Sequence, residues 1–351
     1  MIIQSSTKAY EVHIHSELSF IEKLGVDSDT CLVVDEILYK LYQKEFENLK
    51  PEKLFILEAL ETNKTIEKAL EICEIMTEIP AKRNAKLISF GGGIVQDVTG
   101  FVANILYRGI KWIFVPTTLL ASCDSCIGGK TSLNYKHFKN LLGTFYPPDE
   151  IHICAEFFNT LSERDYQSGL GEVVKFNLMF GTKGLERIEE KIDSLLERDK
   201  TTLDEFVENS LLFKKDFIEE DEFDKGVRIH LNFAHTFGHA FETISDYYIP
   251  HGTAVAIGTI VANRVALSRG LLKEELVLRS EEVLKKIINI DISNVDFDMD
   301  KIVQAIRKDK KQTSTDLTAV LMYDDFSLQV VHDLKQQEIC DAVAYTLECL
   351  Q

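Results

Sequence analysis

The sequence predicts a parallel-sheet α/β domain followed by a mainly α-helical domain. Short apolar runs alternate with amphipathic helical patterns in the first part of the chain, as in β-α-β units on a parallel sheet. A glycine-rich turn joins one apolar run to a helical pattern, as in dinucleotide-binding domains. Long helical patterns with few strand candidates fill the remainder. We therefore expect a Rossmann-like domain over residues 1–155 and a helical domain over residues 156–351.

Five apolar runs in the first domain are expected to form strands, at residues 10–14, 31–34, 54–56, 87–90 and 112–115. Their flanking turn residues and β-branched content favour strands over buried helices. Amphipathic patterns at residues 36–50 and 64–79 predict helices between the strands. A third helix is expected to start near Ile94, directly after the glycine-rich turn. The domain boundary is expected within residues 148–162.

Composition excludes several classes of protein. The 351 residues carry a formal net charge of -18, so the field of the protein repels phosphate backbones and anionic lipids. We expect no nucleic-acid partner and no membrane partner, because the sequence has neither a basic block nor an apolar run of about twenty residues. Seven cysteines without a regular framework suit a reducing compartment. The N-terminus lacks a signal-peptide pattern, and we expect a cytoplasmic protein.

Two glycine-rich loops are candidates for anion binding. Residues 90–97 follow an expected strand and open a helix, so bare backbone amides could face a pyrophosphate, although a tight turn remains an alternative. The second loop ends in Gly128, Gly129 and Lys130 like a P-loop, but Asp124 stands where the P-loop needs glycine, which disfavours ATP. Lys130 still forms a possible anion clamp. Cys123 and the cysteine three residues later have redox spacing, but loop packing is the favoured interpretation.

His235 and His239 are four residues apart, which places both side chains on one face of a helix. His251 and Glu172 could complete a metal site with them, because two histidines and a glutamate with an open position are a common catalytic zinc set. The alternative is a hydrogen-bonded pair of core histidines beside Phe237.

Many short motifs occur in one order along the chain, and together they resemble 3-dehydroquinate synthase and the wider sugar-phosphate cyclases. These motifs are residues 91–97, 108–109, 115–120, 124–131, 139–140, 169–175, 231–239, 251–252 and 309–311. The resemblance implies an NAD-binding N-terminal domain, a helical C-terminal domain with a divalent metal, and a homodimer. It implies a small sugar phosphate as the substrate.

The resemblance also implies roles for individual residues. The zinc ligands are expected to be Glu172, His235 and His251, whereas His239 falls on a position that contacts the substrate or supports the metal, which corrects the spacing argument. The residues expected to hold NAD are Glu61, Lys64, Gly92, Gly93, Ile94, Asp97, Thr117, Thr118, Asp124, Lys139 and Thr160. The residues expected to act on the substrate are Arg108, Asp124, Lys130, Asn140, Lys175, Lys214, Arg228, Asn232, His239 and Lys310. Arg108 is expected at the neighbouring subunit's site, and Lys310 is preferred over Lys311.

The implied reaction converts 3-deoxy-D-arabino-heptulosonate 7-phosphate to 3-dehydroquinate with loss of phosphate. NAD would be reduced and reoxidised within one turnover, and zinc would act as a Lewis acid. Ligand type leaves cobalt, manganese and iron as alternatives. The cationic residues would offset the charge of the substrate. Two other functions remain open: a cyclase for sedoheptulose 7-phosphate, glucose 6-phosphate or an amino analogue, and a metal-dependent polyol dehydrogenase.

The chain departs from the family pattern at several positions. Gln96 replaces a glycine in the cofactor loop, Ala234 replaces a glycine before His235, and residues 135–138 lack the usual proline and glycine. Thr253 replaces a glutamate after His251, which removes a possible acceptor for a metal ligand. We therefore expect a divergent member in which Gln96 adds a side chain near the pyrophosphate and metal binding is weakened.

Overall fold

The structure is a computed structural model that describes residues 1–351 except 50, 52, 137, 294, 309–316 and 351. The chain divides into two compact units. The N-terminal unit comprises Met1–Thr160 and Ile218–Phe223, and the C-terminal unit comprises Leu161–Phe217 and Asp224–Gln351. The first break between the units falls after Thr160.

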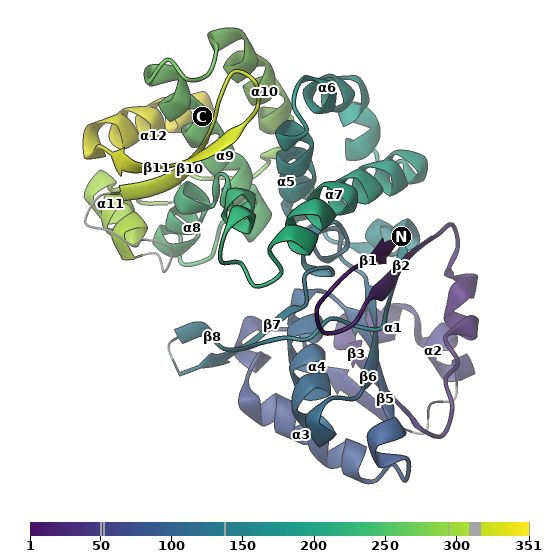
Figure 1. The fold of residues 1–351 in the computed structure, drawn as a ribbon. Coiled ribbons are helices and arrows are strands. Elements are labelled where there is room, and N and C mark those ends of the chain that lie inside the picture. Colours follow the sequence, from purple (N-terminus) through teal and green to yellow (C-terminus); the bar gives the residue numbers. More distant parts are fainter. Residues whose placement is uncertain (50, 52, 137, 294, 309–316, 351) are drawn as a thin grey trace. The chain divides into compact units, whose positions relative to one another are not determined.

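The N-terminal unit is built on a seven-stranded sheet with the order β1-β2-β9-β6-β5-β3-β4 (Figure 1). Only β1 is antiparallel to its neighbour, and the other strands run parallel. The strands are β1 (Ile2–Ile3), β2 (Tyr10–His15), β3 (Thr30–Asp35), β4 (Lys53–Leu57), β5 (Lys86–Gly91), β6 (Lys111–Pro116) and β9 (Glu150–Cys154). All five expected strands are confirmed. The middle residues of β3, β5 and β6 are buried in the core, whereas in the edge strand β4 only Leu57 is buried.

Helices cover both faces of this sheet. The helices are α1 (Glu36–Leu41), α2 (Gln43–Leu49), α3 (Ile66–Thr77) and α4 (Gly93–Ile105). Figure 1 shows α3 and α4 on one face and α1 with α2 on the other. The chain leaves β3 toward the edge strand β4 and returns to β5 on the far side of β3, so right-handed connections place successive helices on opposite faces. The strand order therefore reverses between β3 and β5, which is where open α/β sheets bind ligands.

Two helix predictions needed correction in detail. The single helix expected at residues 36–50 is two short helices that break at Tyr42, whose backbone is not helical. The helix expected from residue 64 begins at Ile66, because Thr65 caps it by accepting a hydrogen bond from the Lys68 amide. The connections also contain 3₁₀ turns at η1 (Leu18–Lys23), η2 (Glu61–Asn63), η3 (Lys82–Asn84), η4 (Leu106–Arg108) and η6 (Ala155–Thr160), and a π-helical turn at η5 (Ala121–Ser125).

A separate hairpin follows η5. It consists of β7 (Lys130–Tyr135) and β8 (Phe138–Phe145), paired antiparallel. Figure 1 shows the hairpin extending away from the side of α4. Sequence patterns missed it because its side chains are mostly polar or exposed, so it lacks the apolar alternation of a half-buried strand.

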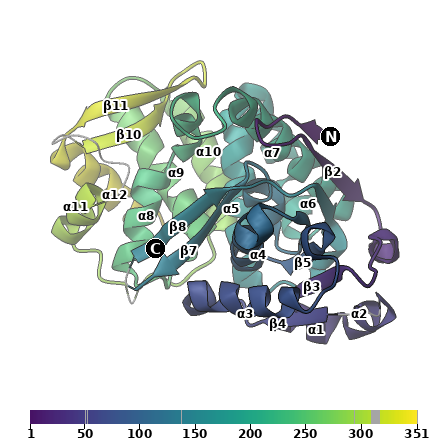
Figure 2. The ribbon, with the colours of Figure 1, turned by 60° about the horizontal axis from the view of Figure 1, so that its bottom comes forward.

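The C-terminal unit is mainly helical, as expected. Its helices are α5 (Glu163–Met179), α6 (Thr182–Leu196), α7 (Lys200–Glu220), α8 (His235–Ile244), α9 (His251–Ser268), α10 (Glu274–Ile287), α11 (Met299–Lys308) and α12 (Gln336–Leu350), with a 3₁₀ turn at η7 (Val227–Asn232). Nearly every residue of α9 is buried, which is typical of a central core helix. Figure 2 shows α8 beside α9, and α5 packs against α9 as well. An unexpected hairpin, β10 (Leu317–Met322) and β11 (Leu328–Leu334), completes the unit.

No helix among the described residues is long and apolar enough to cross a lipid bilayer.

Candidate metal and cofactor sites

Glu172 is the centre of a candidate metal site in the C-terminal unit. It lies in the middle of α5 and is fully buried. Lys175 Nζ lies 2.6 Å from its Oε2, yet neither carboxylate oxygen has a hydrogen bond of good geometry. A buried carboxylate with unsatisfied oxygens is costly unless cations neutralise it. The surroundings of Glu172 therefore favour positive charge.

His235 approaches Glu172 from the first residue of α8. Its Nδ1 donates a hydrogen bond to the Phe233 carbonyl oxygen at 3.0 Å. Its Nε2 lies 3.4 Å from Glu172 Oε1. The residue before it, Ala234, has a left-handed backbone with φ of 70°, which explains why glycine suits this position. Because Nδ1 carries the proton, Nε2 can offer its lone pair to a metal.

His251 approaches the same oxygen from the first residue of α9. Its Nε2 lies 3.3 Å from Glu172 Oε1, and its Nδ1 lies 3.2 Å from Glu242 Oε2. Burial opposes the charged imidazole, but the carboxylates of Glu172 and Glu242 raise the pKa of His251 to about 10 in the absence of metal. Glu242 thus orients His251 as a carboxylate outside the ligand set. The acceptor that seemed lost at Thr253 is supplied by Glu242.

Sequence patterns missed Glu242, although a signal was present. Glu242 stands seven residues after His235 and three after His239, a spacing that puts all three on one helix face. In α8 this face also holds the contact between the His235 and His239 rings, whose centroids are 5.4 Å apart. The role expected for His239 remains a prediction.

The residues present fit a divalent metal ion. One ligand atom from each of Glu172, His235 and His251 lies within 4.8 Å of the others. Both imidazoles have an acceptor on Nδ1 and direct Nε2 at the same oxygen. Burial alone would raise the pKa of Glu172. The nearby charge of Lys175, followed by His235, has the larger combined effect and brings this pKa well below 4.5. The donor set is therefore one ionised carboxylate and two imidazoles, which suits zinc or cobalt.

Among the described residues of the same unit, three cationic side chains are buried. Lys175, Lys214 and Arg228 are 1%, 6% and 4% exposed. Lys175 also donates to the Leu231 carbonyl oxygen at 3.2 Å, which joins α5 to η7. Lys and Arg are rarely this buried without a functional or structural partner. The burial of Lys214 argues against the alternative that it belongs to a solvated helix face.

Other residues expected to contact the substrate are less buried than these three cations or lie in other segments. Asn232 ends η7 and His239 lies on α8, and both are half-buried. Arg108 ends η4 with φ of 67°. It follows the C-terminal end of α4, so about 20 Å of helix separates it from Gly93. Lys310 and Lys311 lie outside the described residues.

The residues expected to hold NAD in the N-terminal unit follow the carboxyl ends of four parallel strands. The segments with these residues are Glu61–Lys64 after β4, Gly92–Asp97 after β5, Thr117–Asp124 after β6 and Thr160 after β9. Parallel strands present these ends along one edge, and ligands bind at that edge near the point of strand reversal. Lys139, which is also expected to hold NAD, comes instead from the β7–β8 hairpin, as does Lys130 of the set expected to contact the substrate.

The glycine-rich turn connects β5 to α4 as expected. Gly92 caps α4, and Gly93 is its first residue. A Cβ on Gly92 would stand 3.0 Å from Thr118 Cγ2, so a side chain there would press on the neighbouring loop. Thr118 in turn accepts a hydrogen bond from the Ala121 amide at 3.2 Å. The turn therefore exposes backbone amides at a helix N-terminus, which suits a pyrophosphate.

A hydrogen-bond network joins several residues that the sequence assigns to cofactor and substrate. Lys64 Nζ lies 2.5 Å from Asp97 Oδ2 and donates to Asn140 Oδ1 at 2.6 Å. The Ser132 amide donates to Asp97 Oδ1 at 3.1 Å. Burial raises the pKa of Asp97, and Lys64 is the main opposing influence. Glu61 belongs to the same region, because Asn134 Nδ2 donates to its Oε1 at 2.9 Å.

Gln96 does not project as expected. Its side chain is buried and bonds Ser125 twice. Gln96 Nε2 donates to the Ser125 carbonyl oxygen at 2.6 Å, and Ser125 Oγ donates to Gln96 Oε1 at 2.7 Å. The glutamine therefore ties the first turn of α4 to η5, the turn that contains Asp124.

Cys123 and Cys126 are both buried thiols that take part in no disulfide. Each thiol donates to a backbone carbonyl, Cys123 to Leu120 at 3.6 Å and Cys126 to Ser122 at 3.4 Å. This arrangement is that of packed thiols in a loop.

Comparisons with known proteins match both halves of the chain. Residues 54–168 match the family model for 3-dehydroquinate synthase N-terminal, and residues 169–312 match the model for 3-dehydroquinate synthase C-terminal. A 3-dehydroquinate synthase from Clostridium tetani is 36% identical over 343 residues, which are 95% of this chain and 91% of the relative.

Two solved structures have the same fold. A 2-epi-5-epi-valiolone synthase from Streptomyces hygroscopicus subsp. jinggangensis, with NAD⁺ and Zn²⁺ bound, has a TM-score of 0.84 at 23% identity. A 2-deoxy-scyllo-inosose synthase complexed with carbaglucose-6-phosphate, NAD⁺ and Co²⁺ has a TM-score of 0.85 at 23% identity. In both comparisons the match covers 98% of each chain.

Proposed function

The chain belongs to the 3-dehydroquinate synthase family, and on this premise we propose that it cyclises 3-deoxy-D-arabino-heptulosonate 7-phosphate to 3-dehydroquinate with loss of phosphate. The product of this reaction is the one for which its relatives are named, since each is called 3-dehydroquinate synthase. It would make the protein a carbon–oxygen lyase of the shikimate pathway that uses NAD and a divalent metal ion.

The observation that carries the proposal is the convergence of His235 and His251 on the buried carboxylate of Glu172. Their fixed Nδ1 atoms leave two Nε2 atoms and one carboxylate for a metal, with further positions for substrate oxygens. When bound, the metal would act as a Lewis acid on substrate hydroxyls, and NAD would accept a hydride and return it.

The chain's own residues would then bind and orient an anionic substrate. Lys175, Lys214 and Arg228 supply positive charge inside a protein of net charge -18. Such a local concentration is needed because the overall field repels a sugar phosphate. Lys175 is held in place by Glu172 on one side and the Leu231 carbonyl on the other. Loss of phosphate needs no protein base in this scheme, because the substrate phosphate can take the proton itself.

The choice among sugar phosphates depends on a carboxylate. The heptulosonate carries one, whereas sedoheptulose 7-phosphate and glucose 6-phosphate do not. A buried guanidinium at Arg228 beside the amide-bearing Asn232 of the same 3₁₀ turn suits a carboxylate. Lys214 would add a second charge. These residues support the substrate that carries a carboxylate over the sugar phosphates that lack one.

Phosphate release tests the proposal directly. Purified, metal-loaded protein would be supplied with NAD and the heptulosonate while phosphate and the absorbance of NADH are followed. Phosphate release without net NADH, together with a carbocyclic product, is the expected result. Net NADH accumulation without phosphate release would instead indicate a polyol dehydrogenase. Turnover of sedoheptulose 7-phosphate or glucose 6-phosphate alone would indicate another cyclase.

We further propose a cytoplasmic homodimer in which Arg108 serves the partner's site. The seven cysteines, all of them described and none in a disulfide, support a reducing compartment. The position of Arg108 at the far end of α4 from Gly93 supports a role outside its own chain's cofactor loops. Mixing Arg108→Ala subunits with metal-site-deficient His235→Ala subunits tests this arrangement, because the two sites of a mixed dimer would then carry either both defects or neither. Restored activity supports sharing, and no restoration contradicts it.

A further inference from the structure

Two histidines and a glutamate meet on neighbouring strands of the N-terminal unit, and the proposed reaction does not use them. Strands β2 and β9 run parallel, with His13 opposite His152 and Glu11 opposite Glu150. Residues two apart on a strand share a face. The register therefore gathers two imidazoles and two carboxylates in one patch.

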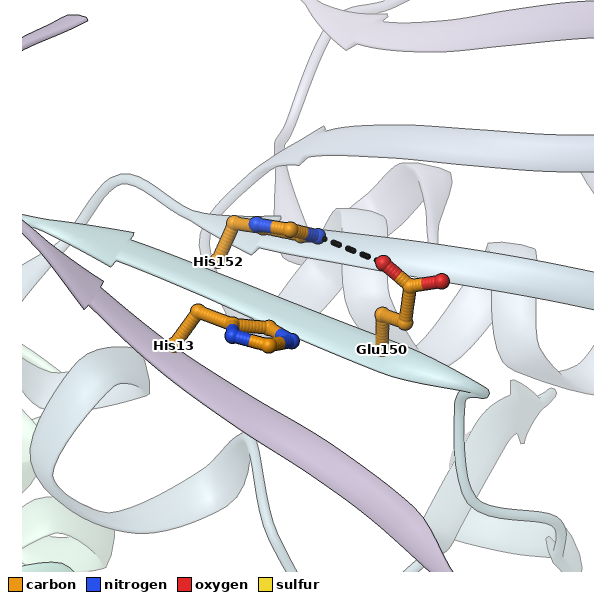
Figure 3. A group of neighbouring side chains, drawn as sticks. All are labelled: His13, Glu150 and His152. Atoms are coloured by element: carbon orange, nitrogen blue, oxygen red, sulfur yellow. Dashed lines mark hydrogen bonds and ion pairs between the residues drawn. The ribbon is translucent and has the colours of Figure 1, made fainter. Parts of the chain in front are cut away.

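The side chains of this patch lie close enough together to form a metal site after a small adjustment. Figure 3 shows the His13 and His152 rings side by side with the Glu150 carboxylate at their tips. The ring centroids are 4.9 Å apart, and His152 Nε2 lies 3.0 Å from Glu150 Oε2. One ligand atom from each of the three residues lies within 4.8 Å of the others. A tetrahedral ion would hold such atoms about 3.4 Å apart, so the His13 side chain, which is 37% exposed, would have to rotate toward the other two ligands.

His152 forms the fixed wall of the patch. Its Nδ1 lies 2.9 Å from His15 Nε2, and the two rings stack at 5.1 Å. Phe20 stacks on His15 in turn, at 4.2 Å. When Nε2 of His152 binds a metal, its Nδ1 carries the proton and donates it to His15 Nε2. This is the outer hydrogen bond that orients a metal-binding histidine.

The patch lies at the opposite edge of the sheet from the candidate cofactor loops. A cavity of about 550 Å³ adjoins His152 and Glu150 and is lined by Lys86 and Lys111, the first residues of β5 and β6. The cofactor loops follow the other ends of these strands. Strands of this length separate the two edges by about 17–20 Å.

We propose that His13, Glu150 and His152 bind a divalent transition-metal ion of the zinc, cobalt, nickel and copper class. Two imidazoles and a carboxylate with open positions suit these ions and disfavour magnesium and calcium. The ion would link β2 to β9 and offset the repulsion between the facing Glu11 and Glu150 carboxylates. It is a second metal site, separate from the one at Glu172.

Metal stoichiometry tests this site. Protein without an affinity tag would be stripped with a chelator, dialysed against Zn²⁺ or Co²⁺ and analysed for bound metal. The expected content is two ions per chain for the wild type, one for His13→Ala and one for His235→Ala. The double variant is expected to bind none. His13→Ala should keep phosphate-releasing activity. If His13→Ala is unstable, Glu150→Gln serves in its place and is expected to lose the same one ion per chain.

A matched control separates this site from general binding to histidine. His332→Ala removes an imidazole of the C-terminal unit that contacts Thr318, and it should still bind two ions. Undiminished metal content in both His13→Ala and Glu150→Gln would overturn the second site. If His235→Ala alone kept both ions while His13→Ala lost one, the second site would stand, and the ligand set of the proposed reaction would fall.

Discussion

Gly171 of α5 lies so close to Gly252 of α9 that a Cβ on Gly171 would stand 1.9 Å from the Gly252 carbonyl oxygen. The reverse contact is as tight, since a Cβ on Gly252 would stand 1.7 Å from the Ser168 carbonyl oxygen. These glycines adjoin Glu172 and His251. The close approach of the two helices therefore sets the distance between the carboxylate and the imidazole.

Replacing Gly171 with alanine should separate α5 from α9 and disrupt the metal site. Ordinary contacts need about 3.4 Å or more, and overpacking of this kind costs about 1–3 kcal/mol or more of unfolding free energy. A displacement of about 1 Å also disables a positioned site. We expect loss of metal from the Glu172 site, measured by metal analysis of dialysed protein.

Gly270→Ala is the control for this change. Gly270 has φ of +68° but open space around it, so alanine adds backbone strain of about 1 kcal/mol without a collision. It should lower stability slightly and keep both the metal and the activity. Equal metal content in the two variants would contradict the proposed role of the helix contact.

Glu242→Gln should weaken metal binding at Glu172 without removing a ligand. The glutamate accepts from His251 Nδ1 at 3.2 Å, and loss of such an outer carboxylate costs about 10- to 100-fold in metal affinity. Competition with a coloured chelator measures the change. Glu282→Gln, an exposed change on α10, should leave the affinity as it is. A Glu242→Gln affinity equal to that of the wild type would show that His251 needs no carboxylate partner.

Gln96→Ala should loosen the connection between α4 and η5. It removes two hydrogen bonds to Ser125 and leaves the carbonyl of the half-buried Ser125 without this partner, at a cost of about 1 kcal/mol. Urea unfolding measures this loss, and fluorescence titration with NADH measures the weaker cofactor binding that we expect. Ser125→Ala removes only the hydroxyl and should cost less. Tighter cofactor binding by Gln96→Ala would restore the view that this side chain obstructs the pyrophosphate.

The pair between Arg269 and Glu338 should make stability depend on pH. Arg269 Nη2 donates to Glu338 Oε1 at 2.5 Å and joins the end of α9 to α12. Burial alone would raise the pKa of Glu338. The hydrogen bond and charge of Arg269 outweigh this effect, so the pKa lies below 4.5 in the folded protein. The pair therefore stabilises the fold above about pH 4.5, and this contribution is lost as the pH falls through the folded-state pKa.

Glu338→Gln tests this dependence. Urea midpoints should show the variant as less stable than the wild type at pH 7, with a difference that shrinks as the pH falls below about 4. Glu348→Gln, an exposed change on the same helix, should show no such trend. A pH-independent difference for Glu338→Gln would mean that the pair acts through packing alone.

The sequence predicted the parallel sheet well because its strands are apolar runs between recognisable turns and amphipathic helices. It missed β10, where all six residues are buried, because a short apolar run has no periodicity that separates strand from helix. It missed β7 and β8 for the opposite reason, since polar side chains dominate that hairpin.

The candidate site shows the same division. The resemblance of the motifs implied that Glu172, His235 and His251 form a metal site, whereas spacing alone favoured His239 beside His235, and the structure brings the three implied ligands together. The resemblance did not indicate Glu242 or Ser132, because these residues support the site through tertiary hydrogen bonds rather than through a motif. Nor did it indicate that Gln96 turns toward Ser125, since rotamer choice depends on neighbours from another segment.

The burial of α9 on nearly every side has a consequence for how this protein can change over generations. The orientation of His251 depends on a helix that has almost no solvent-exposed surface. A substitution that changes the packing of any face of α9 therefore also changes the orientation of the imidazole. Selection for a durable fold and selection for chemistry therefore act on the same side chains. Substitutions in α9 should therefore occur together with compensating substitutions in α5 or α8, and seldom alone.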